Sequence, residues 1–107
     1  MATERAVAEA VLSDLQQVAD ARMRAMMGGW LVYVDEVLIG QINDGELFVK
    51  VSTFADQYAP ELERRSPYAG AKPALVVSEE RRADGGWLRG LLSGSVEALR
   101  KPLRPRR

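Results

Sequence analysis

The chain of 107 residues fits one domain, and its hydrophobic content of 47% is enough to fill one core. It contains no Cys and no His, which excludes disulfides, thiolate nucleophiles, Cys/His zinc sites and any catalytic relay that depends on imidazole. The formal net charge is zero, but five of the 15 basic groups lie in the last eight residues, RKPLRPRR, so residues 1–99 carry a net charge of −5.

No apolar run approaches the roughly 18 residues that a membrane span requires, and charged residues interrupt the apolar stretch near the N-terminus. We therefore expect a cytoplasmic protein with no membrane contact. Carboxylates, Lys and Tyr remain for catalysis, but without the one side chain that titrates near neutral pH, a non-enzymatic role is favoured.

Residues 4–22 have the pattern of an amphipathic helix. Val7, Val11, Leu15 and Val18 recur at helical spacing, and no Gly or Pro interrupts the segment. The sequence predicts a first helix over this whole range.

Residues 30–51 change to the pattern of strands, because WLVYV, VLIGQI and LFVKV are rich in β-branched and aromatic residues. Asp35-Glu36 separates the first two runs and predicts a tight turn. Asp44-Gly45 separates the last two and predicts a type I′ hairpin turn, in which both central residues take positive φ. The three runs therefore predict an antiparallel meander.

The remainder alternates helix and strand. A helix is predicted over residues 53–65, interrupted at Pro60, because proline cannot continue the hydrogen-bond ladder. After a proline-rich loop, residues 74–78 predict a short strand, and EERRADGG a polar connector. Residues 87–99 predict a last helix, and its two glycines, four positions apart, permit the close approach of another segment.

The order α-β-β-β-α-β-α predicts an α+β fold with two layers. We expect an antiparallel sheet, formed by the meander plus one or two further strands, with helices on one face. Residues 1–99 form the single domain of this interpretation, and residues 100–107 a basic flexible tail.

The glycine pair Gly28-Gly29 raises the question of a phosphate-binding loop. Such a loop leads from a strand into the N-terminus of a helix, whereas this pair leads into WLVYV, which has the pattern of a strand. We therefore interpret the pair as a bulge or sharp bend where a strand joins the sheet.

Met23, Met26 and Met27 form a cluster beside these glycines. Thioethers bind Cu(I), but with no Cys or His beside them, adaptable packing is the favoured role, and no cofactor is expected. In an extended strand only one of Met26 and Met27 can face the core, so the other is expected on a contact surface.

The turns contain four carboxylates that could be considered for acid–base catalysis. They fall at opposite ends of a predicted strand, so no pair is expected to meet across a cleft, and no catalytic or metal site is predicted. These acids are Asp35, Glu36, Asp44 and Glu46. Lys72 is a lone loop lysine, for which a solvated position is expected.

The basic tail is the candidate for nucleic-acid contact. Five positive charges can contact phosphates with a salt-dependent affinity, although no recognition helix or aromatic interleaving accompanies them. The acidic body would repel DNA, so a solubilising tail is the favoured interpretation. The candidate residues are Arg100, Lys101, Arg104, Arg106 and Arg107.

Residues 21–51 resemble the N-terminal domain of the TfoX/Sxy competence regulators. That family shows a charged residue, Met-Phe-Gly-Gly, an aromatic strand, an apolar strand and a final D-G-E-L-Y-L-K-V strand. Met26-Met27-Gly28-Gly29 matches the first motif, with Met27 at the usual Phe position. DGELFVKV, which opens with Asp44-Gly45, matches the last.

The resemblance extends over roughly residues 15–99, through SPYAGAKPALVVSE and Trp87 in GGWLRGLL. It implies an α+β fold with an antiparallel sheet and a regulatory, protein-binding role for a stand-alone domain, with no catalytic residue or cofactor. The partner is expected to be a protein of unknown identity, and a homodimer is one option. The alternative function is a small nucleic-acid-associated protein that uses the basic tail.

Overall fold

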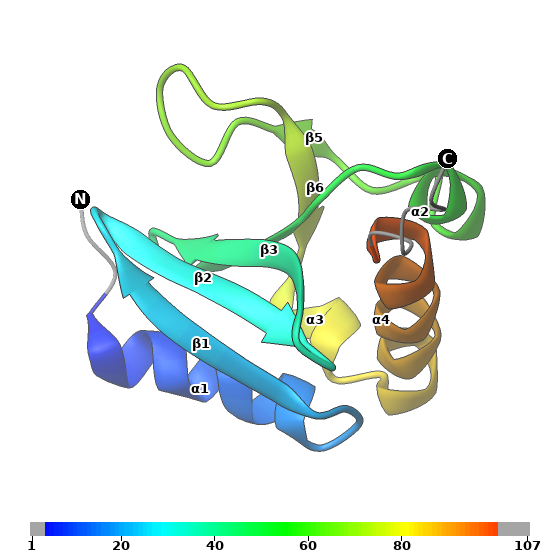
Figure 1. The fold of residues 1–107 in the computed structure, drawn as a ribbon, viewed down its shortest axis with the longest axis horizontal. Coiled ribbons are helices and arrows are strands. Elements are labelled where there is room, and N and C mark those ends of the chain that lie inside the picture. Colours follow the sequence, from blue (N-terminus) through cyan, green and yellow to red (C-terminus); the bar gives the residue numbers. More distant parts are fainter. Residues whose placement is uncertain (1–3, 101–107) are drawn as a thin grey trace, which may run out of the picture.

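The computed structural model describes residues 4–100, which form four helices and a single six-stranded sheet (Figure 1). In chain order the elements are α1 (Arg5–Gln16), β1 (Ala21–Met26), β2 (Gly29–Val34), β3 (Val37–Asn43), β4 (Glu46–Val49), α2 (Thr53–Tyr58), β5 (Arg64–Arg65), β6 (Ala74–Val77), α3 (Glu79–Arg82) and α4 (Gly85–Leu99).

The sheet is antiparallel throughout, with the strand order β1-β2-β3-β4-β6-β5. Its first four strands form a meander, and β6 and β5 extend the sheet beyond β4. The predicted α+β fold with an antiparallel sheet is therefore confirmed, although the sheet has six strands rather than the four or five expected, because β1 adds a fourth strand to the meander.

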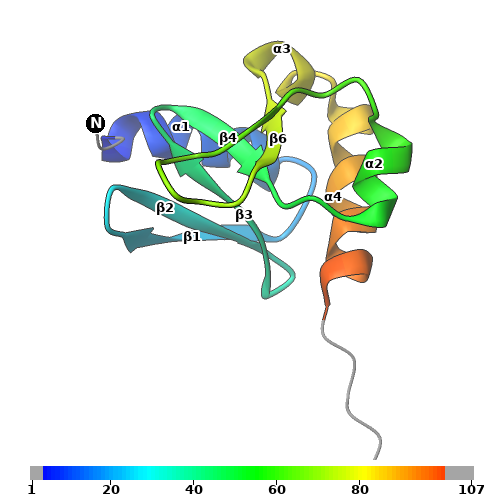
Figure 2. The ribbon, with the colours of Figure 1, turned by 90° about the horizontal axis from the view of Figure 1, so that it is seen from above.

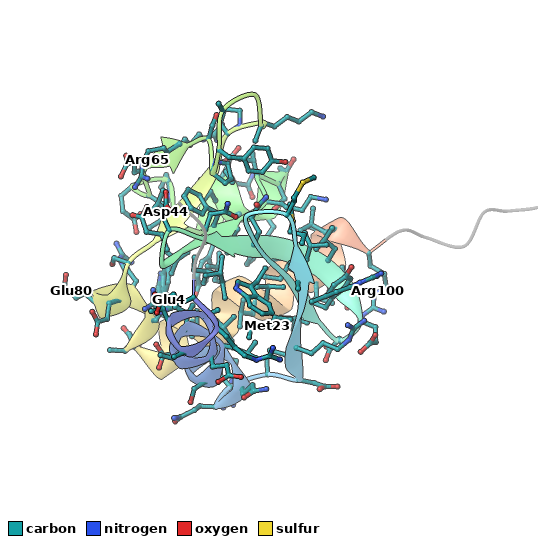
Figure 3. The ribbon with its side chains drawn as sticks, turned by 90° about the vertical axis from the view of Figure 1, so that its left-hand side faces the viewer. Glu4, Met23, Asp44, Arg65, Glu80 and Arg100 are labelled. Atoms are coloured by element: carbon teal, nitrogen blue, oxygen red, sulfur yellow. The ribbon has the colours of Figure 1, made fainter. Side chains whose placement is uncertain are left out.

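The two faces of the sheet differ in what covers them. One face carries Val32, Ile42 and Val49 into a core shared with Leu15 of α1 and Leu91 of α4, all of them buried. Figure 3, which looks along α1, shows the sheet curving over α1 and α4. The strand register places Phe48 and Gln41 opposite each other on the other face.

The predicted helix over residues 4–22 is too long. α1 ends at Gln16, and Ala21–Met26 forms β1, the edge strand of the meander. The residues ARMRAM are good helix formers, so local propensity gave no sign of a strand. Pairing with β2 along all six residues overrides that propensity.

Three smaller differences concern the second half of the chain. The helix predicted over residues 53–65 ends at Tyr58, before Pro60 as expected, but Arg64–Arg65 then pairs with β6. The polar connector contains α3, whose first turn is capped by the Ser78 hydroxyl, an acceptor from the Arg81 amide. α4 begins at Gly85 rather than at residue 87, because the Asp84 carboxylate caps it.

α2 lies alongside α4, as Figures 1 and 2 both show. The rings of Phe54 and Tyr58 stack with their centroids 5.2 Å apart, and they rest on Gly94 and Gly90 of α4. The Tyr58 hydroxyl donates a hydrogen bond of 2.8 Å to the Trp87 carbonyl. The glycine pair predicted to permit close approach therefore receives the two aromatic rings of α2.

Candidate functional site

The hairpin between β1 and β2 contains the glycine pair. Met26 pairs with Gly29, so Met27 and Gly28 are the two central residues of the turn, and Gly28 has a φ of 81°. The predicted conformational role fits this geometry, but the bulge interpretation is wrong, because a strand precedes the pair and makes it a hairpin turn. The turn leads from strand to strand, which is not the path of a phosphate loop into a helix.

The hairpin between β3 and β4 contains the second motif. Asn43 pairs with Glu46, and the central residues Asp44 and Gly45 have φ values of 52° and 75°. Both values are positive, as a type I′ turn requires, so this turn prediction is confirmed. Asp35 and Glu36 form a similar turn between β2 and β3, with φ values of 51° and 65°.

Asn43 connects the two hairpins. Its side-chain amide donates a hydrogen bond of 3.3 Å to the Gly28 carbonyl, and the residue is only 6% exposed. A Cβ at Gly29 would lie 2.6 Å from the Asn43 Oδ1 atom and 2.7 Å from the Ile42 carbonyl oxygen. The two glycines therefore serve different ends: Gly28 supplies the positive φ, and Gly29 leaves room for Asn43.

A hollow of about 650 Å³ opens between these turns and the loop that follows β5. Three segments line it: residues 26–28, residues 43–44 and residues 67–69. Pro67 is buried, although it lies in a loop. The hollow thus joins segments that are far apart in the sequence.

Exposed apolar side chains gather around this hollow. Within residues 4–100, the large hydrophobic side chains that remain exposed are Val7, Met27 and Tyr68, at 44%, 94% and 48%. Met27 and Tyr68 line the hollow, and Val7 lies beside Gly45, with its Cγ1 atom 3.4 Å from where a Cβ would stand.

We call this region the turn-end surface and define it by Val7, Met26, Met27, Asp44, Pro67 and Tyr68. Figure 3 looks onto this end of the molecule and shows Asp44 above the first residues of α1, where Glu4 lies. The sequence motifs identified Met26, Met27 and Asp44. They missed Pro67 and Tyr68, for which the only signal was the loop composition SPYAGAKP.

An ion pair flanks the turn-end surface. Arg65 donates two hydrogen bonds, of 2.8 and 2.9 Å, to the two carboxylate oxygens of Glu46, and its guanidinium lies 5.6 Å from the centre of the Phe48 ring. These bonds lower the pKa of Glu46 below its ordinary value and raise the pKa of Arg65. The pair fastens β5 to β4 and covers the outer face of the sheet over Phe48.

The other turn acids lie at the far end of β3. Glu36 accepts hydrogen bonds from Arg22, with a shortest distance of 2.7 Å, and the same guanidinium lies 4.3 Å from the centre of the Tyr33 ring. The bond to Arg22 lowers the pKa of Glu36. In residues 4–100 no cluster of three or more acidic, Cys or His side chains is arranged to hold a metal ion.

The structure does not bring the remaining predicted residues to the hollow. Trp87 is half-buried on α4, where the Arg81 guanidinium lies 4.7 Å from its ring. Arg100 is exposed and lines a separate hollow of about 530 Å³ with Asp35 and Lys50. The other tail candidates, Lys101, Arg104, Arg106 and Arg107, lie outside the described residues.

The chain matches no protein-family model and no curated protein. Among the helices of residues 4–100, none combines the length and the apolar character required to cross a bilayer.

Proposed function

We propose that the chain is a non-enzymatic, cytoplasmic regulatory module, related to the N-terminal domain of the TfoX/Sxy competence regulators, that acts by binding a protein at the turn-end surface. The observation that carries the proposal is the position of Met27, which is 94% exposed at the rim of a hollow with apolar walls. Large exposed apolar groups that gather in one place are typical of interaction sites.

The side chains of this surface are suited to binding rather than to chemistry. Methionine is flexible and polarisable, so it adapts to partners of different shape. Tyr68 offers an apolar ring with a polar end, a combination enriched at interfaces. Removing a side chain such as Met27 from water contributes about 1.5–3 kcal/mol, which is enough to make it an anchor of a small interface.

The test compares two variants that each add one carboxylate. Met27→Glu places the charge on the turn-end surface, and Gln57→Glu places it on an exposed position of α2. We expect the wild type and Gln57→Glu to capture the same protein from a native extract, and Met27→Glu to lose it, as measured by quantitative mass spectrometry. Capture that is equal for all three proteins would contradict the proposal.

The alternative is a small nucleic-acid-associated protein. It would use Arg100 and the four basic residues that follow it, with Lys50, which lines the same hollow as Arg100, as a further positive group. Salt-dependent binding to DNA separates this alternative from the leading proposal, because an apolar anchor such as Met27 loses little affinity as salt rises.

A further inference from the structure

We infer that the outer edge of β1 binds an extended peptide segment as an additional strand of the sheet, with acidic side chains at alternate positions of that segment. β1 is the outermost strand at this edge of the sheet (Figure 1). The inference goes beyond the proposed function, because it concerns the edge of β1 and does not depend on the turn-end surface.

The register of the first hairpin determines which backbone groups of β1 face outward. In an antiparallel pair, residues that exchange hydrogen bonds with the neighbouring strand alternate with residues whose N–H and C=O groups point away from it. The Asp35 amide donates to the Asp20 carbonyl at 2.9 Å, and the pairing continues without a register shift as far as Met26. Met23 and Ala25 therefore direct their backbone groups away from β2.

The outward backbone groups of Met23 and Ala25 have no hydrogen-bond partner among residues 4–100. α1 satisfies the beginning of the edge, where the Gln16 side-chain amide donates a bond of 3.1 Å to the Ala21 carbonyl. Ala25 is exposed, so the edge is open beyond that point. A strand added here gains main-chain hydrogen bonds, which supply affinity for an extended peptide.

The arginines of β1 determine which peptide the edge prefers. Arg22 and Arg24 are exposed and two positions apart, so they lie on the same face of the sheet. Arg22 is bonded to Glu36, whereas the Arg24 guanidinium has no hydrogen bond or ion pair within the described part of the chain. An acidic side chain opposite Arg24 on the added strand forms a cross-strand ion pair. A second acid, two positions along, lies opposite Arg22.

The same charges make a second copy of this chain a poor occupant of the edge. In an antiparallel pair centred on Met23, Arg22 of each copy would lie opposite Arg24 of the other. Like charges directly opposite each other destabilise a pair of strands. At the other edge of the sheet, β5 has only two residues and offers little length for pairing. The edge of β1 is therefore suited to an acidic segment of a different protein.

The geometry predicts which backbone nitrogens of the peptide matter. An acid opposite Arg24 points its own N–H away from β1, because Arg24 directs its backbone groups toward β2. The residues on either side of that acid, opposite Met23 and Ala25, point their N–H groups at β1. In a peptide that alternates Glu and Thr, N-methyl groups on Thr should therefore block binding, whereas N-methyl groups on Glu should not.

The experiment measures the binding of such fluorescently labelled peptides to the full chain by fluorescence anisotropy. We expect the Glu/Thr peptide and its Glu-methylated form to bind, and the Thr-methylated form to bind roughly tenfold more weakly or less, because it loses hydrogen bonds to the edge. A peptide with Lys in place of Glu should also bind more weakly than the Glu/Thr peptide. Attraction to the basic tail alone would not distinguish the two methylated peptides.

Variants of the protein test the same contact from the other side. Arg24→Glu should weaken binding of the Glu/Thr peptide by a factor of about five, since attraction becomes repulsion. Arg89→Glu, at an exposed position of α4, is the control and should bind as the wild type does. Ala25→Pro removes an outward N–H but no bond to β2, so it should weaken binding while the circular dichroism spectrum stays that of the folded chain.

The outcomes separate this inference from the proposed function. Equal binding of the two methylated peptides would overturn strand addition, and equal binding of the Glu and Lys peptides would overturn the acidic preference. Self-association of the wild type that Ala25→Pro abolishes, measured by sedimentation, would make a second copy the occupant and overturn the inference. Each of these results leaves the protein capture that depends on Met27 untouched, so the two proposals can fail independently.

Discussion

The hydroxyl of Tyr58 lies so close to Gly90 that a Cβ at position 90 would stand 2.2 Å from its oxygen. One turn along α4, a Cβ at Gly94 would stand 2.0 Å from the Phe54 ring. Each of these two glycines weakens the helix, but together they leave the space in which the two aromatic rings of α2 pack against α4. The helix gives up about 1 kcal/mol at each glycine, and the packing of two rings offsets that loss.

We predict that Gly90→Ala lowers the free energy of unfolding by about 1–2 kcal/mol, because Tyr58 must move away from its bond to the Trp87 carbonyl. Gly86→Ala in the same helix is the control, since its nearest neighbour would be 3.9 Å away. The control should be at least as stable as the wild type in urea unfolding. A stable Gly90→Ala variant would show that the ring does not depend on this close approach.

The two glycines of the first hairpin should respond differently to substitution. We expect Gly28→Ala to cost about 1 kcal/mol through its positive φ alone, and Gly28→Asn to recover most of this, because Asn tolerates that conformation. We expect Gly29→Ala to cost about 2–3 kcal/mol, because it clashes with backbone at Ile42. Equal losses for the two Ala variants in thermal unfolding would contradict the separate roles.

The same thermal experiment tests the phosphate-loop alternative. Millimolar ATP, NAD or phosphate should leave the midpoint of the wild type unchanged, since a ligand that binds the native state would raise it. A rise that disappears in a folded Gly28→Ala variant would restore a binding role for this turn.

The Glu46–Arg65 pair should make stability depend on pH. Because the folded-state pKa of Glu46 is lowered, its contribution is fully present above the ordinary carboxyl pKa of 4.5 and is lost as pH falls through the lowered value. Glu46→Gln should therefore be less stable by about 0.5 kcal/mol at pH 7 and equal to the wild type in strong acid. Glu97→Gln, at an exposed position of α4, is the control and should show no such loss. A deficit of Glu46→Gln that persists at low pH would point to packing rather than charge.

The basic tail yields a prediction about DNA. Under the alternative function, the intact chain binds duplex DNA weakly, with an affinity that falls steeply as salt rises, and a chain truncated after Arg100 loses this binding; under the leading proposal neither chain binds. The reason is that residues 1–99 carry a net charge of −5 and repel phosphate. Fluorescence anisotropy at several salt concentrations measures the effect. Undiminished binding by the truncated chain would place the contact on the folded body.

The sequence predicted the meander well where turn signals and residue composition agree. Asp44-Gly45 identifies a turn type by its chemistry, and the runs on either side of it are rich in the β-branched and aromatic residues that strands favour. β1 escaped prediction because Arg22, Met23 and Arg24 have no preference for strands, and their conformation depends on pairing with β2.

The candidate site could be predicted only in part, because it joins distant segments. Met27 stands out beside the glycine pair, but Tyr68 lies some forty residues later in a loop without periodicity, and no local pattern places it beside Met27. Similarly, the reason for a glycine at position 90 is evident only from the structure, in which Tyr58 packs against it. Contacts of this kind depend on the path of the whole chain.

Arg82 links helix α1, which is made early, to segments that are made late, and this link affects the order in which the chain can fold during synthesis. Its side chain, only 9% exposed, donates to the Asp14 carboxylate and to the Val77 carbonyl, so it ties α3 to α1 and β6 across 68 positions. A ribosome adding roughly 5–20 residues each second needs several seconds to deliver Arg82 after Asp14. Throughout that interval the apolar side of α1 lacks Leu88 and Leu91 of α4, with which it shares the core. The packing of the first helix is thus completed only after the last helix has been made, and until then the nascent chain exposes part of the apolar side of α1.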